Sequence, residues 1–210
     1  GRNMLNVAGK VMMDRNAPEG VLDTPESGYD DTKALIGEWH GKGRQLYAIT
    51  PRFAITSSPE QMEMAGSLMR EFPDLHMQTH LSENHAEVAF TQELYPWSRD
   101  YTDVYEHYGL LGPRALFGHC IHLSEREADA LSDSGSVAVF CPTSNLFLGS
   151  GLFDYQRFRQ RAKPLRIDSP MRLRPCASTA RARAAIQPPR CMIASILRRM
   201  PPSGGCAARS

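Results

Sequence analysis

Leu75–Asn84 reads LHMQTHLSEN, a short β-type pattern that runs directly into polar and charged side chains. The same arrangement occurs five times in the first 160 residues. The predicted strands and their polar continuations are Leu5–Met13 into Asp14–Asn16, Leu46–Thr50 into Pro51–Phe53, Leu75–Thr79 into His80–Asn84, Ala115–Phe117 into Gly118–His122, and Ser136–Phe140 into Cys141–Asn145. Because parallel strands end on a common face, we expect these polar segments to lie near one another.

Amphipathic helices separate the predicted strands. Ser58 and Gln61 have the spacing of a capping box at the start of one helix, and Ser124 and Glu127 have it at the start of another. In the first of these helices, apolar residues recur at helical spacing on one face: Met62, Ala65, Met69 and Phe72. The alternation of strands and helices predicts parallel βαβ units, and therefore an α/β fold.

Two α/β architectures fit this alternation. A doubly wound sheet binds ligands chiefly at one switch point, whereas every strand of a (β/α)8 barrel ends at the active-site face. Since all five predicted strands end in functional side chains, the sequence favours the barrel. Five units are too few to close eight strands. We therefore expect residues 1–160 to form part of a (β/α)8 TIM barrel, about strands 3 to 7.

Charge is distributed unevenly along the chain. The 210 residues are 41% hydrophobic with a formal net charge of +1, which argues against a protein built mainly to neutralise phosphates. Residues 161–210 nevertheless hold 11 of the 24 Lys and Arg and one of the 23 Asp and Glu, a balance of +10. Residues 1–160 hold the other 13 and 22, a balance of −9. These are two different kinds of polypeptide.

We accordingly divide the chain into a barrel part, 1–160, and an Arg/Pro/Ala-rich tail, 161–210. The tail contains 7 of the 15 prolines and no aromatic residue. This composition is typical of a GC-rich gene read in a shifted frame, so we expect the tail to be non-native to the fold. The alternative is a natural disordered basic tail, since weak hydrophobic patterning also favours disorder.

The cysteines and the length of the apolar runs indicate the cellular compartment of the protein. The five cysteines are odd in number and lack C-x-x-C spacing, which suits free thiols in a reducing cytosol. No apolar run reaches the ~18–20 residues of a membrane span. We expect a cytoplasmic protein without membrane contact. The chain begins with Gly1 and enters an apolar run almost at once, so we also expect its start to be truncated.

Four side chains at predicted strand ends form a candidate site. His80 can bind a metal, and Glu83, three residues later, can accept and return a proton. His119 follows the next predicted strand, and Arg52 follows the preceding one. Each histidine alone fits a hydrogen-bonded structural residue. The four residues together favour a catalytic pocket.

The chain resembles the guanine deaminases, zinc enzymes of the amidohydrolase superfamily, through nearly all of residues 1–160. A histidine after each of two successive strands is general to the superfamily, whereas two of the matching segments are more specific to the guanine enzymes: Pro51–Phe53 (PRF) and Thr79–Asn84 (THLSEN). The remaining matches are Gly9–Asn16 (GKVMMDRN), Ser27–Asp31 (SGYDD), Gly118–Cys120 (GHC) and Cys141–Leu146 (CPTSNL).

This resemblance implies hydrolysis of guanine to xanthine and ammonia with one zinc ion per intact site. It makes His80 a zinc ligand and Glu83 the catalytic acid and base. It makes His119 the catalytic residue that orients the attacking oxygen, and it places Arg52, Phe53, His80 and Glu83 around the substrate. The resemblance also implies that the intact enzyme is a homodimer, because the enzymes of this family commonly pair.

Two features of the family pattern are missing. The chain contains no His-x-His and no Asp in a Gly-Thr-Asp setting, although the family takes zinc ligands from both. A catalytic zinc needs three protein ligands, so we expect this chain alone neither to bind zinc tightly nor to turn over guanine.

Two other hypotheses remain open. One is a sibling amidohydrolase that acts on another aminated heterocycle, such as a triazine or an adenine-type nucleoside. The other is a non-catalytic protein whose basic tail binds nucleic acid. The tail has no aromatic residue on which bases could stack, which argues against this role.

Overall fold

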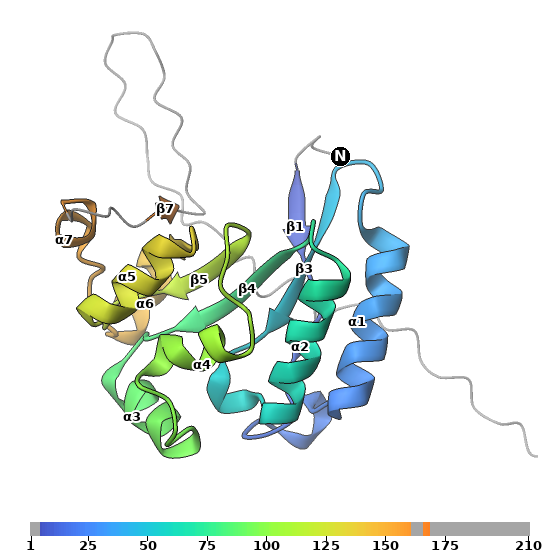
Figure 1. Ribbon diagram of the computed structural model, residues 1–210, viewed down its shortest axis with the longest axis horizontal. Coiled ribbons are helices and arrows are strands. Elements are labelled where there is room, and N and C mark those ends of the chain that lie inside the picture. The colour runs from blue at the N-terminus through green and yellow to red at the C-terminus, as the bar shows by residue number, and fades with distance from the viewer. Residues whose placement is uncertain (1–4, 161–165, 169–210) are drawn as a thin grey trace, which may run out of the picture. The chain divides into compact units, whose positions relative to one another are not determined.

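The computed structural model describes residues 5–160 and 166–168, and these form one parallel sheet with helices packed on it (Figure 1). The strands follow one another across the sheet in chain order. They are β1 (Asn6–Ala8), β3 (Gln45–Pro51), β4 (His76–Leu81), β5 (Ala115–His119), β6 (Val137–Val139) and β7 (Arg166–Asp168), with β2 (Val11–Met12) also paired to β3.

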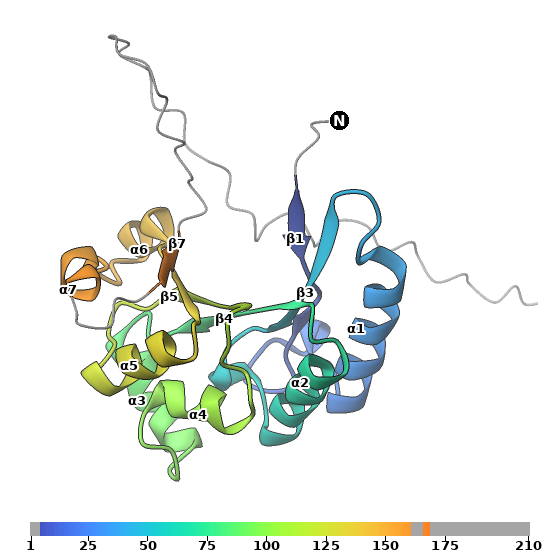
Figure 2. The ribbon, with the colours of Figure 1, turned by 45° about the horizontal axis from the view of Figure 1, so that its top comes forward.

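The helices that connect the strands from β2 to β6 lie on one face of this curved sheet (Figure 2). They are α1 (Pro25–Trp39), α2 (Pro59–Glu71), α3 (His85–Leu94), α4 (Tyr101–His107) and α5 (Glu125–Asp133). Two short helices, α6 (Pro142–Leu148) and α7 (Tyr155–Arg159), follow β6, and two 3-10 turns are η1 (Glu19–Val21) and η2 (Ala54–Thr56). Sequential strands with helices on one face form the wall of a (β/α)8 barrel, whereas a doubly wound sheet reverses its strand order. The predicted partial barrel is therefore confirmed.

The first predicted strand, Leu5–Met13, divides into two short strands at Gly9. A Cβ atom on Gly9 would lie 1.7 Å from the carbonyl oxygen of Ala48, so this position accepts only glycine. The next residue, Lys10, donates its backbone N–H to the hydroxyl of Tyr47 at 2.9 Å instead of continuing the ladder. Both halves nevertheless pair with β3.

Strand β7 lies inside the segment that the sequence predicts as tail. Arg166–Asp168 pairs in parallel with β6, and Ile167 packs against the hydrophobic core. The ordered sheet therefore contains three residues beyond the predicted boundary at 160. The rest of the predicted tail, 161–165 and 169–210, lies outside the described residues.

The predicted helix starts are present, with one difference. Ser58 caps α2 by accepting the backbone N–H of Gln61 at 3.1 Å. The side chain of Gln61 does not close the expected capping box. It is fully buried and points toward α1, where its Nε2 lies 3.5 Å from the Cβ position of Gly28. Burial of Met62 and Ala65 on the same helix confirms the predicted apolar face.

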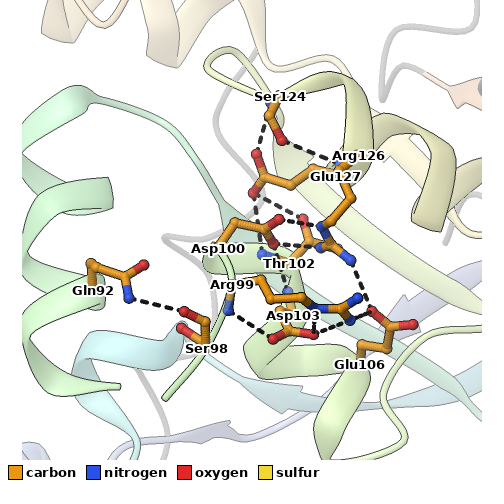
Figure 3. Close-up of polar contacts among 10 residues, drawn as sticks. All are labelled: Gln92, Ser98, Arg99, Asp100, Thr102, Asp103, Glu106, Ser124, Arg126 and Glu127. Atoms are coloured by element: carbon orange, nitrogen blue, oxygen red, sulfur yellow. Dashed lines mark hydrogen bonds and ion pairs between the residues drawn. The ribbon is translucent and has the colours of Figure 1, made fainter. Parts of the chain in front are cut away.

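A polar network braces α4 against α5 (Figure 3). Glu127 is 4% exposed and forms the predicted capping box with Ser124, whose N–H it accepts at 2.7 Å. Its other carboxylate oxygen accepts from the N–H and the hydroxyl of Thr102, both at 3.2 Å. Ion pairs extend the network: Arg126 with Asp100 and Glu106, and Arg99 with Asp103 and Glu106. The network fixes the helix that precedes β5 to the helix that follows it.

Across the described ranges, none of the helices is both long enough and sufficiently apolar to cross a lipid bilayer.

Candidate active site

The two histidines of the candidate site lie at the carboxyl ends of adjacent strands. His80 is the penultimate residue of β4, and His119 is the last residue of β5, so both strands extend farther than the sequence predicts. Their rings stack with centroids 5.2 Å apart and planes 26° apart. The ring of Phe53 is tilted against that of His80, with centroids 5.9 Å apart. Parallel pairing of β3, β4 and β5 thus brings these predicted residues together.

Glu83 completes this group from the turn between β4 and α3. Its Oε1 lies 3.4 Å from Nδ1 of His119. The hydroxyl of Ser150, beyond α6, donates to the same oxygen at 3.2 Å. The carboxylate is thus held between an imidazole and a hydroxyl, close to the strand ends.

His119 is oriented by a buried amide. Its Nδ1 lies 2.7 Å from Oδ1 of Asn145, a residue of α6 with no exposed surface. Because both neighbours of Nδ1, the amide oxygen and the Glu83 carboxylate, are acceptors, Nδ1 carries a proton and donates to them.

The backbone around this group is strained. His119 and Cys120 have φ angles of 72° and 52°, and Ser82 has a φ of 50°. Side-chain-bearing residues seldom occupy this left-handed region, and such strain concentrates at functional sites.

The tautomer of His80 is also fixed. The carbonyl oxygen of Arg52 lies 2.7 Å from Nδ1 of His80. The same oxygen also accepts the backbone N–H of His80 at 3.0 Å. Since a carbonyl only accepts, Nδ1 carries the proton and Nε2 is available as a metal ligand. Burial, together with the nearby His119, lowers the pKa of His80 to about 4. The ring is therefore neutral at pH 7, as a ligand must be.

Arg52 and Phe53 form the edge of the site next to β3. The Arg52 side chain is exposed, and its guanidinium carbon lies 4.8 Å from the centroid of the Phe53 ring. Two residues of the polar segment Asp14–Asn16 form hydrogen bonds to the 3-10 turn η2, which follows Phe53. Arg15 donates to the carbonyl of Ala54 at 2.9 Å, and Asn16 donates to that of Ile55 at 2.8 Å. Arg15 and Asn16 therefore support the loop that carries Arg52.

Zinc can be tested against these residues. His80 fits one ligand position because its Nε2 is unprotonated and its ring is fixed. A catalytic zinc takes three protein ligands. Within residues 5–160 and 166–168, no cluster of three or more His, Cys, Asp or Glu side chains could hold an ion. This part of the chain supplies one imidazole and does not supply a complete zinc site.

The sequence alone did not single out three residues that contact the site. Asn145 and Ser150 orient His119 and Glu83, and Tyr105 of α4 donates to the carbonyl of His80 at 2.8 Å. Asn145 carried a signal in the sequence, because it lies in the polar segment that follows the predicted strand Ser136–Phe140. The structure adds that it is the one buried residue of α6. Tyr105 follows the apolar spacing of α4 and is typical of a core residue.

The sequence profile of the amidohydrolase family matches residues 3–158. The chain belongs to the amidohydrolase family. Its curated relatives include the guanine deaminase of Escherichia coli (strain K12), 57% identical over 159 residues, which are 76% of this chain and 36% of that protein. A probable guanine deaminase of Deinococcus radiodurans is 43% identical over 156 residues, 74% of this chain and 36% of that protein. The chain thus spans about a third of the length of these relatives.

Solved structures agree with this amidohydrolase assignment. The E. coli guanine deaminase superposes with a TM-score of 0.77 at 55% identity, over 80% of this chain and 39% of that one. A guanine deaminase from C. acetobutylicum with guanine bound in its active site gives 0.72 at 33% identity, over 77% and 38%. An atrazine chlorohydrolase from Arthrobacter aurescens complexed with zinc gives 0.70 at 16% identity, over 78% and 37%, and shares the fold alone.

Proposed function

We propose that this chain supplies part of the active site of a zinc-dependent guanine deaminase, which hydrolyses guanine to xanthine and ammonia. One observation carries the proposal. The Arg52–Phe53 pair, His80 and the Glu83–His119 pair lie on adjoining strand ends. They do so in a chain that is 57% identical to the guanine deaminase of E. coli over the matched residues.

Arg52 and Phe53 are the proposed purine-binding residues. The exposed guanidinium offers several N–H donors to the carbonyl and ring nitrogens of guanine. The Phe53 ring, 5.9 Å from His80, provides an apolar surface beside the reacting centre. The pair would hold the base with its amino-bearing carbon toward Glu83.

Glu83 is the proposed proton carrier. In the reaction a C–O bond forms at the amino-bearing carbon and the C–N bond to the amino group breaks. A carboxylate can take a proton from the attacking water and return it to a ring nitrogen and to the leaving amine. Contacts from His119 and Ser150 hold one carboxylate oxygen, which leaves the other for this exchange.

His119 is the proposed orienting residue. With Nδ1 occupied by Asn145, its Nε2 lone pair can accept a hydrogen bond from the attacking water. His80 would be one of the zinc ligands through Nε2. Zinc, when bound, would lower the pKa of water, so that hydroxide is available as the nucleophile at neutral pH.

Guanine turnover would belong to the whole enzyme, because the chain spans about a third of its relatives. The 210-residue chain by itself should bind zinc weakly and leave guanine unchanged. We also propose that the intact enzyme is a cytoplasmic homodimer.

A hybrid enzyme tests the proposal. Residues 1–160 of this chain would replace the aligned segment of E. coli guanine deaminase, whose flanking parts complete the barrel. The hybrid should bind zinc and release ammonia from guanine in preference to adenine and aminated triazines. A folded, zinc-loaded hybrid that prefers a triazine would support a sibling activity instead. Salt-sensitive DNA binding by the 210-residue chain, with no guanine turnover by the hybrid, would support the nucleic-acid hypothesis.

A further inference from the structure

The hydroxyl of Tyr105 links the backbone next to Phe53 with the backbone of His80. It donates to the carbonyl of His80 at 2.8 Å and accepts the backbone N–H of Ala54, the residue after Phe53, at 3.1 Å. We infer that Tyr105 is a positioning residue, which sets the separation between the Arg52–Phe53 pair and His80. The inference rests on the proposed function, because that function gives the separation its importance.

A second set of contacts supports this role. Thr79 donates its hydroxyl toward both the oxygen of Tyr105 and the carbonyl of Arg52, each at 3.2 Å. The carbonyl of Arg52 in turn fixes the tautomer of His80. The end of β3 and the end of β4 are therefore tied together twice, once through Arg52 and once through the Tyr105 hydroxyl.

The hydroxyl of Tyr105 is suited to a fixed link. The side chain has no exposed surface, and burial raises its pKa, so the oxygen remains a neutral donor and acceptor. Its ring packs on Phe117 of β5, with centroids 5.5 Å apart. A phenylalanine would fill the same space and lose only the polar contacts of the hydroxyl.

Tyr101 provides a matched comparison. It lies one turn earlier on α4, is 2% exposed, and stacks on Tyr105 with centroids 5.6 Å apart. Its hydroxyl interacts with Thr91, Glu87 and Tyr105, and it makes none of the hydrogen bonds to His80 or Ala54. Tyr101→Phe and Tyr105→Phe thus remove the same atom from neighbouring buried positions, and only the second change cuts the link to the site.

The first test uses the 210-residue chain itself, labelled with nitrogen-15. Nuclear magnetic resonance should show His80 as the Nδ1–H tautomer. Tyr105→Phe should shift the His80 ring nitrogens and the Ala54 amide, whereas Tyr101→Phe, which leaves the bonds to His80 and Ala54 in place, should shift both much less. Unchanged signals in Tyr105→Phe, or equal shifts in both variants, would overturn the inference. Should Tyr105→Phe fail to fold, Thr79→Val removes one contact to the same oxygen. Because it also removes a contact to the Arg52 carbonyl, which itself contacts His80, the signal that must then shift is the Ala54 amide.

The second test uses the hybrid enzyme. Misplacement of reacting groups by less than about 1 Å can cost up to about 100-fold in rate. Tyr105→Phe should therefore lower kcat/KM for guanine about 10- to 100-fold at unchanged zinc content, with part of the loss in kcat. Tyr101→Phe should stay within about twofold. Equal kinetics in the two variants would overturn the role in positioning. A hybrid without guanine turnover would defeat the proposed function alone, because the first test does not depend on turnover.

Discussion

Nδ1 of His119 lies 3.4 Å from Oε1 of Glu83, although the two residues belong to different strand–helix units. The register of the sheet explains this proximity. Leu81 of β4 pairs with His119 of β5, so Glu83 begins its turn beside the last residue of the neighbouring strand. The left-handed φ of His119, 72°, then bends the chain at the same point. A carboxylate and an imidazole are thereby presented together at the strand ends.

The roles of Glu83 and His80 can be separated by zinc content. In the hybrid enzyme, Glu83→Gln should lower guanine turnover by at least about 100-fold while zinc remains bound, because the carboxylate moves protons without holding the metal. His80→Ala should lose zinc as well as turnover. Zinc per protein, measured by plasma mass spectrometry, distinguishes the two variants. Equal zinc occupancy in both would refute the assigned roles.

Arg52 should act mainly in substrate binding. Arg52→Ala in the hybrid should raise KM for guanine by about 10-fold or more, because the guanidinium supplies charge-assisted hydrogen bonds to the base. Arg70→Ala is the control, since Arg70 is an exposed arginine on α2 that pairs with Glu63. Steady-state kinetics measure both variants. A near-normal KM in Arg52→Ala would remove this residue from the site.

Glu87 should make stability depend on pH. This residue of α3 is 7% exposed, and burial, with a further contribution from the charge of Glu83, raises its pKa from 4.5 to about 7. The folded chain therefore keeps a proton that the unfolded chain releases above pH 4.5. The stabilisation is complete below the unfolded value and is lost as the pH rises through about 7.

The variant Glu87→Gln isolates this effect. The lowered pKa of His80 acts in the opposite direction, stabilising the fold as the pH rises from about 4 to 6.5, and it is present in both proteins. The free energy of unfolding in urea should fall by about 3 kcal/mol between pH 4.5 and 8 relative to the Gln variant. A constant difference between the two proteins over that range would show that Glu87 titrates normally.

Glu127 should stabilise the α4–α5 contact. Glu127→Ala leaves the donors of Ser124 and Thr102 without their carboxylate, which should cost about 2–3 kcal/mol of unfolding free energy. Glu63→Ala removes an exposed carboxylate and should change the free energy by less than about 1 kcal/mol. Urea unfolding of the 210-residue chain measures both. A similar small loss in each would mean that the network of Figure 3 contributes little to stability.

The sequence predicted the parts of the site that follow from strand order. His80 and His119 each end a readable β-type run, so parallel pairing was enough to bring them together. Asn145 and Ser150 reach the site through the path of α6 and its loop, and that path depends on tertiary packing. Tyr105 belongs to an apolar face in the sequence, and only the structure shows where its hydroxyl points.

The limits of the sheet were harder to predict than its middle. Strand β7 is three residues long and lies in a segment dominated by Arg and Pro, so composition concealed it. Its place in the sheet comes from pairing with β6 and from the packing of Ile167 on the core. The division of the first strand at Gly9 likewise depends on the approach of Ala48, a contact between distant residues.

Oxygen-18 transfer tests the central claim most directly, that these strand ends carry the hydrolytic deamination of guanine. The zinc-loaded hybrid would be incubated with guanine in oxygen-18 water, and the product analysed by mass spectrometry. We predict xanthine with one oxygen-18 at the former amino-bearing carbon, formed at least about 100-fold more slowly by Glu83→Gln at equal zinc content. A folded, zinc-loaded hybrid that forms no labelled xanthine, or a Glu83→Gln variant as fast as the unchanged hybrid, would contradict the claim.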